Sequence, residues 1–287
     1  MTRSNLLARR LWTLIEPIHI VTYFSAEPLS TLANAGYRGF WMGYFAGRAA
    51  PLGPVGADLV FSTFYNFSQQ HVSRAIPDAW SFAPPSAALE ARQRGSVEAL
   101  QRAFAQLETG DDLRTTVEHL RMAALTAPEE GRPLFAANRG LPWPEEPVAA
   151  LWHACTLLRE HRGDGHVSAL VAAGIGGREA NALQVAAGAV PREVFNVARH
   201  YDDDEWHHVT RRLMDRGLID SNGRLTDRGV ELRSEVEDRT DRAALTACDS
   251  LSDQQLDFLI DSLTPLARAV IRTGDIPDVT PIGRFDV

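Results

Sequence analysis

The sequence predicts a mainly α-helical protein made of two similar halves, and three observations lead to this fold class. Apolar residues recur at helical spacing along most of the chain, and a proline-rich break, GLPWPEEP at 140–147, divides it near the middle. Fragments that precede the break recur in the same order after it. With 287 residues and 45% hydrophobic content, the chain can fill two cores of ordinary size. We therefore predict domains at 1–143 and 144–287.

The recurring fragments predict a tandem duplication. Leu11-Trp12 matches Leu151-Trp152 at an offset of 140 residues, and the offset then shrinks to 132, as small deletions in a second copy would produce. The remaining matches are LANAGYRG at 32–39 with LVAAGIGG at 170–177, Tyr65 with Tyr201, HVSR at 71–74 with HVTR at 208–211, and Pro133-Leu134 with Pro265-Leu266. We expect the halves to pack about a pseudo-two-fold axis, as homodimers do, so that their first helices meet around a cavity.

Composition limits the classes of protein that this chain could belong to. The net charge of −8 disfavours a surface devoted to phosphate binding, although an acidic protein can still carry one basic face. The N-terminus lacks the apolar run of a signal peptide, and no segment has about 20 consecutive apolar residues. Cys155 and Cys248 have no CxxC spacing, which is typical of free cytoplasmic thiols. We expect a cytoplasmic protein.

In the first half, apolar periodicity predicts a helix at 4–24 that Pro17 kinks, then a short helix and an aromatic run at 59–67. Further helices are expected at 68–76, 87–107 and 112–125.

The second half has clearer signals. We expect three short helices at 167–173, 177–188 and 191–200, and a fourth at 203–216 that ends at Gly217. The segment 218–226 predicts two short strands around Asn222-Gly223, because these residues favour the positive φ values of a two-residue turn. Long helices follow at 227–244 and 253–272.

Residues 211–241, RRLMDRGLIDSNGRLTDRGVELRSEVEDRTD, resemble the recognition-helix end, wing and dimer helix of MarR-type winged-helix proteins. The whole chain also resembles an actinobacterial family described as helix-turn-helix proteins, through EPIH, GRAAPLG, FYNF and LREHRGDGH. These resemblances imply tandem winged-helix-like domains of a helix-turn-helix type, with a short β-hairpin wing in the second half. They imply no particular reaction.

The MarR-type resemblance implies that helix 203–216 would enter the major groove of DNA. Its first turn carries Asp202, Asp203, Asp204 and Glu205, which would stand against a polyanion. From 191 to 234 there are eight arginines and nine carboxylates. DNA binding is therefore disfavoured, and the residues that could still support it are Arg211, Arg212, Arg216 and Arg224.

The most polar stretch is LREHRGDGHV, 158–167, which we place at the end of an apolar helix because Gly163 and Gly165 allow a tight turn. Its candidate ligand-binding side chains are Glu160, His161, Arg162, Asp164 and His166. A metal site would need His161, Asp164 and His166 to converge, but this spacing selects no particular metal. The structural alternative is a surface Glu160–Arg162 pair, with His161 and Asp164 capping the helix and His166 exposed.

Glu16, His19 and Tyr23 are three and four residues apart, so they share one stripe of the first helix. They could orient a ligand or relay a proton, or His19 could be a structural residue hydrogen-bonded to Glu16. Arg48 lies in an apolar segment, and we expect Asp58, Glu16 or an anionic ligand beside it.

Eight aromatic residues cluster in this part of the chain: Phe40, Trp41, Tyr44, Phe45, Phe61, Phe64, Tyr65 and Phe67. They could form a core or line a pocket for a flat apolar ligand, in which Tyr44, Tyr65 and Asn66 would contact the ligand.

The favoured hypothesis is a small-molecule-binding protein with an aromatic pocket between the two halves, on a repurposed winged-helix scaffold. One alternative is a ligand-responsive, MarR-like DNA-binding regulator. Another is an enzyme that uses His19 or His161 as acid–base, with a bound metal or tetrapyrrole. Glycine-rich, nucleophile and metal-ligand motifs are absent from the sequence, so the cofactor stays unassigned. The chain would be a pseudo-dimeric monomer or a homodimer.

Overall fold

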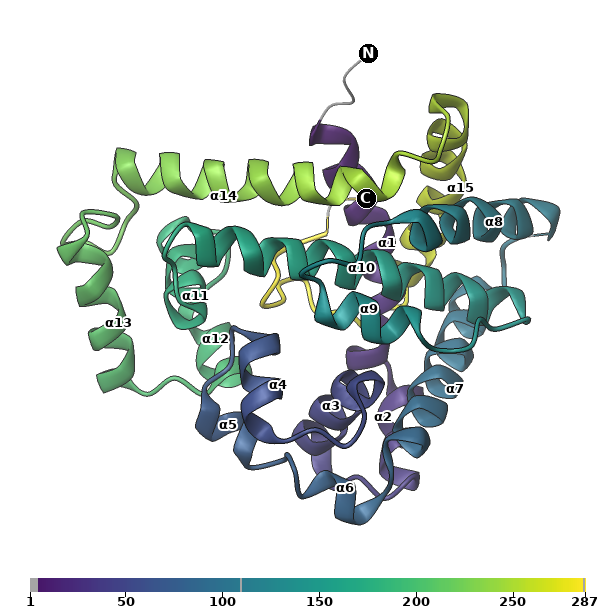
Figure 1. The fold of residues 1–287 in the computed structure, drawn as a ribbon, viewed down its shortest axis with the longest axis horizontal. Helices are drawn as coiled ribbons and strands as arrows, with labels where there is room; N and C mark the ends of the chain where they lie inside the picture. Colours follow the sequence, from purple (N-terminus) through teal and green to yellow (C-terminus); the bar gives the residue numbers. More distant parts are fainter. Residues whose placement is uncertain (1–4, 109, 286) are drawn as a thin grey trace.

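The computed structural model describes residues 5–108, 110–285 and 287. In these ranges the chain forms fifteen α-helices, and β-pairing is limited to two isolated bridges (Figure 1). The prediction of a mainly α-helical protein is therefore confirmed. None of the described helices combines the length and apolar character needed to cross a membrane.

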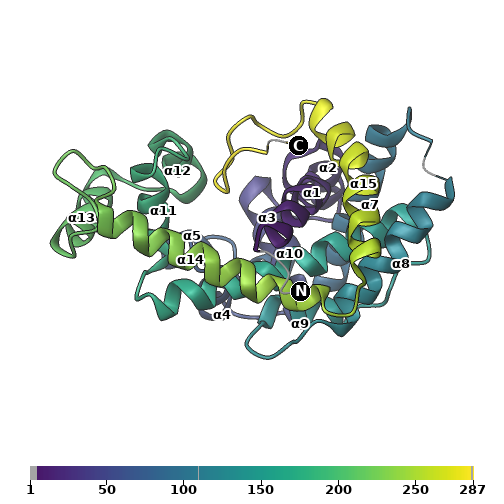
Figure 2. The same ribbon diagram turned by 90° about the horizontal axis from the view of Figure 1, so that it is seen from above.

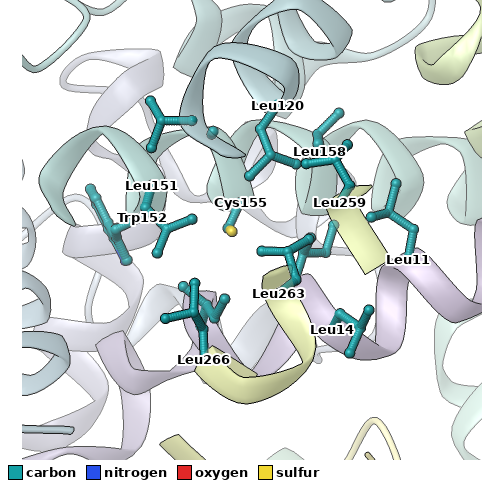
Figure 3. Close-up of a cluster of buried hydrophobic side chains, with 14 of the residues drawn as sticks. Leu11, Leu14, Leu120, Leu151, Trp152, Cys155, Leu158, Leu259, Leu263 and Leu266 are labelled. Atoms are coloured by element: carbon teal, nitrogen blue, oxygen red, sulfur yellow. The ribbon is translucent and has the colours of Figure 1, made fainter. Parts of the chain in front are cut away.

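A central bundle forms the middle of the molecule. Its helices are α1 (Asn5–Phe24), α7 (Pro85–Phe104), α8 (Gly110–Thr126), α10 (Pro147–Ala172), α14 (Asp227–Leu245) and α15 (Asp253–Arg272). Helix α1 continues through Pro17. Leu11, Leu151 and Leu263 pack in one apolar cluster, which takes residues from both sides of position 143 (Figure 3). Each such leucine contributes about 2 kcal/mol by leaving water, so this cluster holds the two parts of the chain together.

A first lobe lies beneath the bundle in Figure 1 and is rich in aromatic side chains. It consists of α2 (Ala26–Asn34), α3 (Gly39–Ala49), a 3₁₀ turn (Ala50–Leu52), α4 (Ala57–Phe64), α5 (Gln69–Ser73) and α6 (Ala79–Phe82), and α9 (Pro133–Arg139) packs nearby. Phe45, Phe64 and Phe67 fill its core. The helix predicted at 68–76 is shorter than expected: Ser68 caps its start and the helix ends at Ser73.

A second lobe projects from one end of α10 and α14 (Figures 1 and 2). It consists of α11 (Gly177–Ala186), α12 (Arg192–Arg199) and α13 (Asp203–Asp215), followed by a turn at 218–226. The expectation of two strands in this turn is wrong, because a single Ile219–Leu225 bridge forms. Gly223 has the expected positive φ, whereas Asn222 does not. The Asp220 carboxylate accepts the N–H groups of residues 222 and 224 and organises the turn instead.

The expectation that α10 ends within 158–167 is also wrong, because α10 runs unbroken to Ala172 and includes the helix predicted at 167–173. Gly163 and Gly165 are helical here. A Cβ on Gly165 would lie 3.2 Å from the Cβ of Ala243 in α14, so this glycine permits close helix packing rather than a turn. The polar stretch consequently lies in the middle of the molecule.

The two lobes contact each other directly. The hydroxyl of Tyr65, at the end of α4, donates to the carbonyl of Ile175 at 2.6 Å. The side-chain amide of Asn181 in α11 donates to the Asn66 carbonyl at 3.0 Å. Nearby, the rings of His71 and His200 stack with centroids 3.8 Å apart. These contacts clamp the second lobe onto the first.

Candidate ligand-binding site

Two adjoining cavities lie where the lobes meet the central bundle. The larger has a volume of about 300 Å³ and is mainly aromatic and aliphatic. The smaller has a volume of about 140 Å³, and many charged and polar side chains line it beside apolar ones. Four residues line both cavities: Tyr44, Arg159, Arg199 and Ile282. The site therefore has an apolar compartment and a charged compartment with a shared wall.

The walls come from segments that are distant in the sequence. Tyr23 of α1 and the α3 residues Phe40, Trp41 and Tyr44 line the larger cavity. Residues 197–199 of α12 face them, and residues 280–282 of the C-terminal segment complete the wall. Figure 2 shows this segment passing between α12 and α1. The sequence gave no periodic signal there, so its contribution to the cavity was missed.

The smaller cavity includes several of the residues predicted to bind a ligand. They are Glu16, Tyr44, Arg48, Asn66, Arg162, Asp164 and His166. Tyr23 lines the larger cavity. Tyr65 serves the contact between the lobes instead, because its hydroxyl is bound to Ile175. His161 packs edge-on against Phe135 with centroids 5.0 Å apart, away from both cavity walls.

Glu160 lines neither cavity, but it pairs with two arginines, Arg48 and Arg159, that line the charged compartment. Its buried carboxylate lies 2.8 Å from Arg159 Nη1 and 3.3 Å from Arg48 Nη2. Burial alone would raise the pKa of Glu160, but Arg159 and Arg48 outweigh this effect and lower it to about 2. The expected partner of Arg48 was Asp58, Glu16 or a ligand, and the structure places Glu160 there instead. The alternative expectation, a surface ion pair between Glu160 and Arg162, is likewise wrong.

The Glu16, His19 and Tyr23 stripe is buried, but its hydrogen bonds differ from those expected. Glu16 accepts from Trp12 Nε1 at 3.0 Å and from Arg159 Nε at 3.3 Å, so it does not serve His19. His19 Nδ1 lies 2.9 Å from the Thr156 hydroxyl, and its Nε2 lies 3.2 Å from the Tyr23 hydroxyl.

The protonation of His19 follows from these neighbours. The Thr156 hydroxyl donates to the Trp152 carbonyl, so it accepts from His19 Nδ1–H. Nε2 then accepts the Tyr23 proton. Burial, followed by the charge of Arg159, lowers the pKa of His19 well below its ordinary value. His19 is therefore a neutral acceptor that fixes the orientation of the Tyr23 hydroxyl, and its use as an acid–base stays a prediction.

The other polar residues of α10 have separate partners. Arg162 pairs with Asp241 of α14 at 3.1 Å, and His166 Nδ1 lies 2.9 Å from the Thr240 hydroxyl. Asp164 accepts the Phe135 backbone N–H at 2.9 Å, and burial raises its pKa to about 7. His161, Asp164 and His166 thus face different neighbours. Across the described ranges, no three His, Cys, Asp or Glu side chains gather as a metal-binding group would.

Sequence reasoning also missed two charged cavity residues, Arg159 and Arg199. Arg199 lies at the end of α12, with its guanidinium 4.1 Å from the centroid of the Phe67 ring. It sits in a helix whose sequence alone shows no reason for it to face the interior. The signal that could have found Arg159 was its position in the polar stretch of α10, four residues after Cys155 in the same buried helix.

The second lobe has the geometry of a helix-turn-helix. Helices α12 and α13 are separated by residues 200–202, where His200 adopts a left-handed conformation and Asp202 caps α13. The profile of a family described as "Helix-turn-helix family" matches residues 8–277, nearly the whole chain. The chain belongs to this helix-turn-helix family. No curated protein and no solved structure matches it.

In this helix-turn-helix protein, the four arginines predicted for DNA contact differ in their surroundings. Arg212 and Arg216 both pair with the buried Glu179 of α11, at 3.2 and 3.3 Å. Arg211 and Arg224 are exposed. Part of the positive charge of α13 therefore stabilises the lobe itself.

Proposed function

We propose that this protein binds a small organic molecule in the joined cavities. The observation that carries the proposal is the composition of the walls. An aromatic surface from α3, polar residues of α1 and α10, and the end of α12 line two adjoining cavities that share four residues. Its volume is at the lower end of the range for ligand pockets, which suits a compound of one or two rings.

A cavity-filling variant tests the proposal. Ala198→Trp would place an indole at the wall of the larger cavity. The control is Asp261→Trp, which adds the same side chain at an exposed position in a hollow of α8 and α15. Thermal-shift screening against a library of small aromatic and alicyclic acids, amides and amines should give stabilising compounds. Binding should be lost in Ala198→Trp and kept in Asp261→Trp. An absence of such compounds, or equal binding by Ala198→Trp, would contradict the proposal.

A second candidate function is DNA binding, which the family membership and the exposed Arg211 and Arg224 favour. The first lobe offers no second reading helix of comparable length, since α5 has five residues and α13 has thirteen. Binding would then use one helix and two phosphate contacts. Fluorescence anisotropy with duplex DNA should show salt-dependent binding that Arg211→Ala with Arg224→Ala abolishes. Salt-independent binding, or binding unchanged in this variant, would contradict it.

We also propose that domains 1–143 and 144–287 are repeats related by a pseudo-two-fold axis. Helix α1 packs on α14 and α15, while α10 packs on α7 and α8, as an exchange of equivalent helices requires. Trp12 and Trp152 each lie beneath a guanidinium, from Arg162 and Arg92 respectively. A crystal structure in which a two-fold rotation fails to carry α1, α7 and α8 onto α10, α14 and α15 would overturn the duplication.

A further inference from the structure

Arg199 differs from the other arginines of the joined cavities. Its Nη1 donates to the Ala198 carbonyl at 2.9 Å, and its guanidinium lies over the Phe67 ring. Its buried Nε, like that of Arg162, has no hydrogen-bond partner among the described residues. Burial lowers the pKa of Arg199 to about 10, a value at which the side chain is still cationic at neutral pH.

The other three arginines are neutralised by the protein. Arg48 pairs with Glu160, and Arg159 pairs with both Glu160 and Glu16. Arg162 pairs with Glu237 and Asp241. Within the described part of the chain, Arg199 makes no ion pair within 4.0 Å. Arg199 is only partly exposed, and an unpaired charge that is partly shielded from water is costly unless something neutralises it.

The position of this charge indicates what would neutralise it. Arg199 lines both compartments, so an anionic group beside it would leave the rest of a ligand in the larger cavity. There, Phe40, Trp41 and Tyr44 present aromatic rings. One uncompensated arginine matches one negative charge, and the planar guanidinium matches a carboxylate through two parallel hydrogen bonds. A phosphate dianion would bring a second charge that this cavity does not neutralise.

We propose that the cavity selects an amphipathic monoanion, an aromatic or alicyclic carboxylate, whose carboxylate pairs with Arg199 and whose ring lies against the α3 aromatic residues. This inference rests on the ligand-binding function proposed above and names its ligand class. Arg199 belongs to the second lobe and the aromatic wall to the first. The ligand would therefore bridge the two lobes and strengthen their clamp.

Isothermal titration calorimetry with 2-naphthoate and 2-naphthamide tests the inference, because these probes share a ring system and differ in charge. The wild-type protein should bind 2-naphthoate at least tenfold more tightly than 2-naphthamide. Arg199→Gln should remove this preference and leave 2-naphthamide binding unchanged. The matched control is Arg228→Gln, an exposed arginine of α14, which should keep the wild-type preference.

Arg199 also packs on Phe67, so Arg199→Lys provides a second variant that keeps the charge. It should retain a preference for 2-naphthoate, and near-ultraviolet circular dichroism should show an intact fold. Equal wild-type affinity for the two probes, or unchanged selectivity in Arg199→Gln, would overturn the carboxylate inference and leave the cavity function standing. Failure of both probes to bind would contradict the carboxylate inference. Failure of the wider compound library as well would contradict the binding function itself.

Discussion

The two lobes share one backbone feature at their contact, and the segments around that feature differ. In each, a helix that leads to the lobe–lobe contact ends in a non-glycine residue with positive φ, Tyr65 after α4 and His200 after α12. In the first lobe, phenylalanine and tryptophan rings form the apolar cluster near this contact. The second lobe instead continues into a thirteen-residue helix with an acidic first turn.

The two lobes therefore contribute to the cavity in different ways. The first lobe has a short α5 and an aromatic core, so it acts as a wall that packs against the bundle. The second lobe contains the helix-turn-helix, and its Arg199 lines the cavities beside that wall. The ion pair between Arg48 and Glu160 connects the first lobe to α10. The close approach of Gly177 to Tyr65 and the stacked rings of His71 and His200 connect the two lobes.

The largest loss of unfolding free energy is expected at the ion pairs that connect the first lobe to the bundle. Glu160→Gln leaves Arg48 and Arg159 without their shared carboxylate in a buried site, which should cost about 3–5 kcal/mol of unfolding free energy. Urea denaturation measures the loss. The control Glu235→Gln removes an exposed pair with Arg239 and should change stability by less than about 0.5 kcal/mol. Equal effects of the two variants would show that the buried network is unimportant.

The next effect is expected where the lobes touch. A Cβ on Gly177 would lie 1.9 Å from the Tyr65 carbonyl oxygen, so Gly177→Ala should force the lobes apart and cost about 2–3 kcal/mol. Gly56→Ala is the control, because no atom lies within 4 Å of its added Cβ. Thermal unfolding of both variants makes the comparison. A wild-type melting temperature for Gly177→Ala would mean that the lobes are not clamped at this point.

A pH-dependent effect is expected from the histidine stack. His71 faces His200 and the guanidinium groups of Arg199, Arg74 and Arg178, and burial with these charges lowers its pKa to about 3. As the pH falls below about 6.5, the His71 imidazole therefore binds a proton in the unfolded chain but not in the folded chain. Stability from this residue is complete above pH 6.5 and falls by roughly 1 kcal/mol per pH unit between pH 6.5 and 3.

His71→Phe should make the unfolding free energy less dependent on pH in this range. The exposed His208→Gln, as control, should keep the wild-type dependence. Denaturant titrations at intervals from pH 7 to pH 4 measure both. An unaltered slope in His71→Phe would show that the stack does not titrate with unfolding.

The smallest effect is expected for a single hydrogen bond between the lobes. Tyr65→Phe removes the hydroxyl that donates to the Ile175 carbonyl at 2.6 Å and should cost about 1 kcal/mol. Relative to the wild-type protein, this variant should show faster hydrogen exchange in α11, while exchange in α8, which lies away from the contact, should not change. Uniform exchange in both helices would indicate that this bond does not couple the lobes.

The sequence predicted individual helices better than the connections between them. Helix 253–272 agrees with α15, and helix 227–244 with α14, because capping residues and amphipathic periodicity are local properties. The error at 158–167 arose because a glycine can mark either a turn or a close helix contact. Only the position of Ala243 against Gly165 distinguishes these roles.

In the candidate site, too, the sequence indicated local properties of residues but not the contacts between distant segments. Residue types alone indicated that Arg48 needed a partner, since a charged group in an apolar segment is costly unless neutralised. Which charges pair depends on how α1, α3 and α10 cross, and this is decided by packing between segments more than 100 residues apart.

What the sequence determined by itself was the helical class, many helix boundaries and the need to neutralise the charge of Arg48. Those features follow from hydrogen bonding and hydrophobic periodicity within a few turns of chain. The tertiary structure decided that the C-terminal segment and α12 complete a cavity, and that Arg199 is the arginine left without a carboxylate there. The physical reason is that neutralising a charge depends on distance in space, and distance along the chain does not report it.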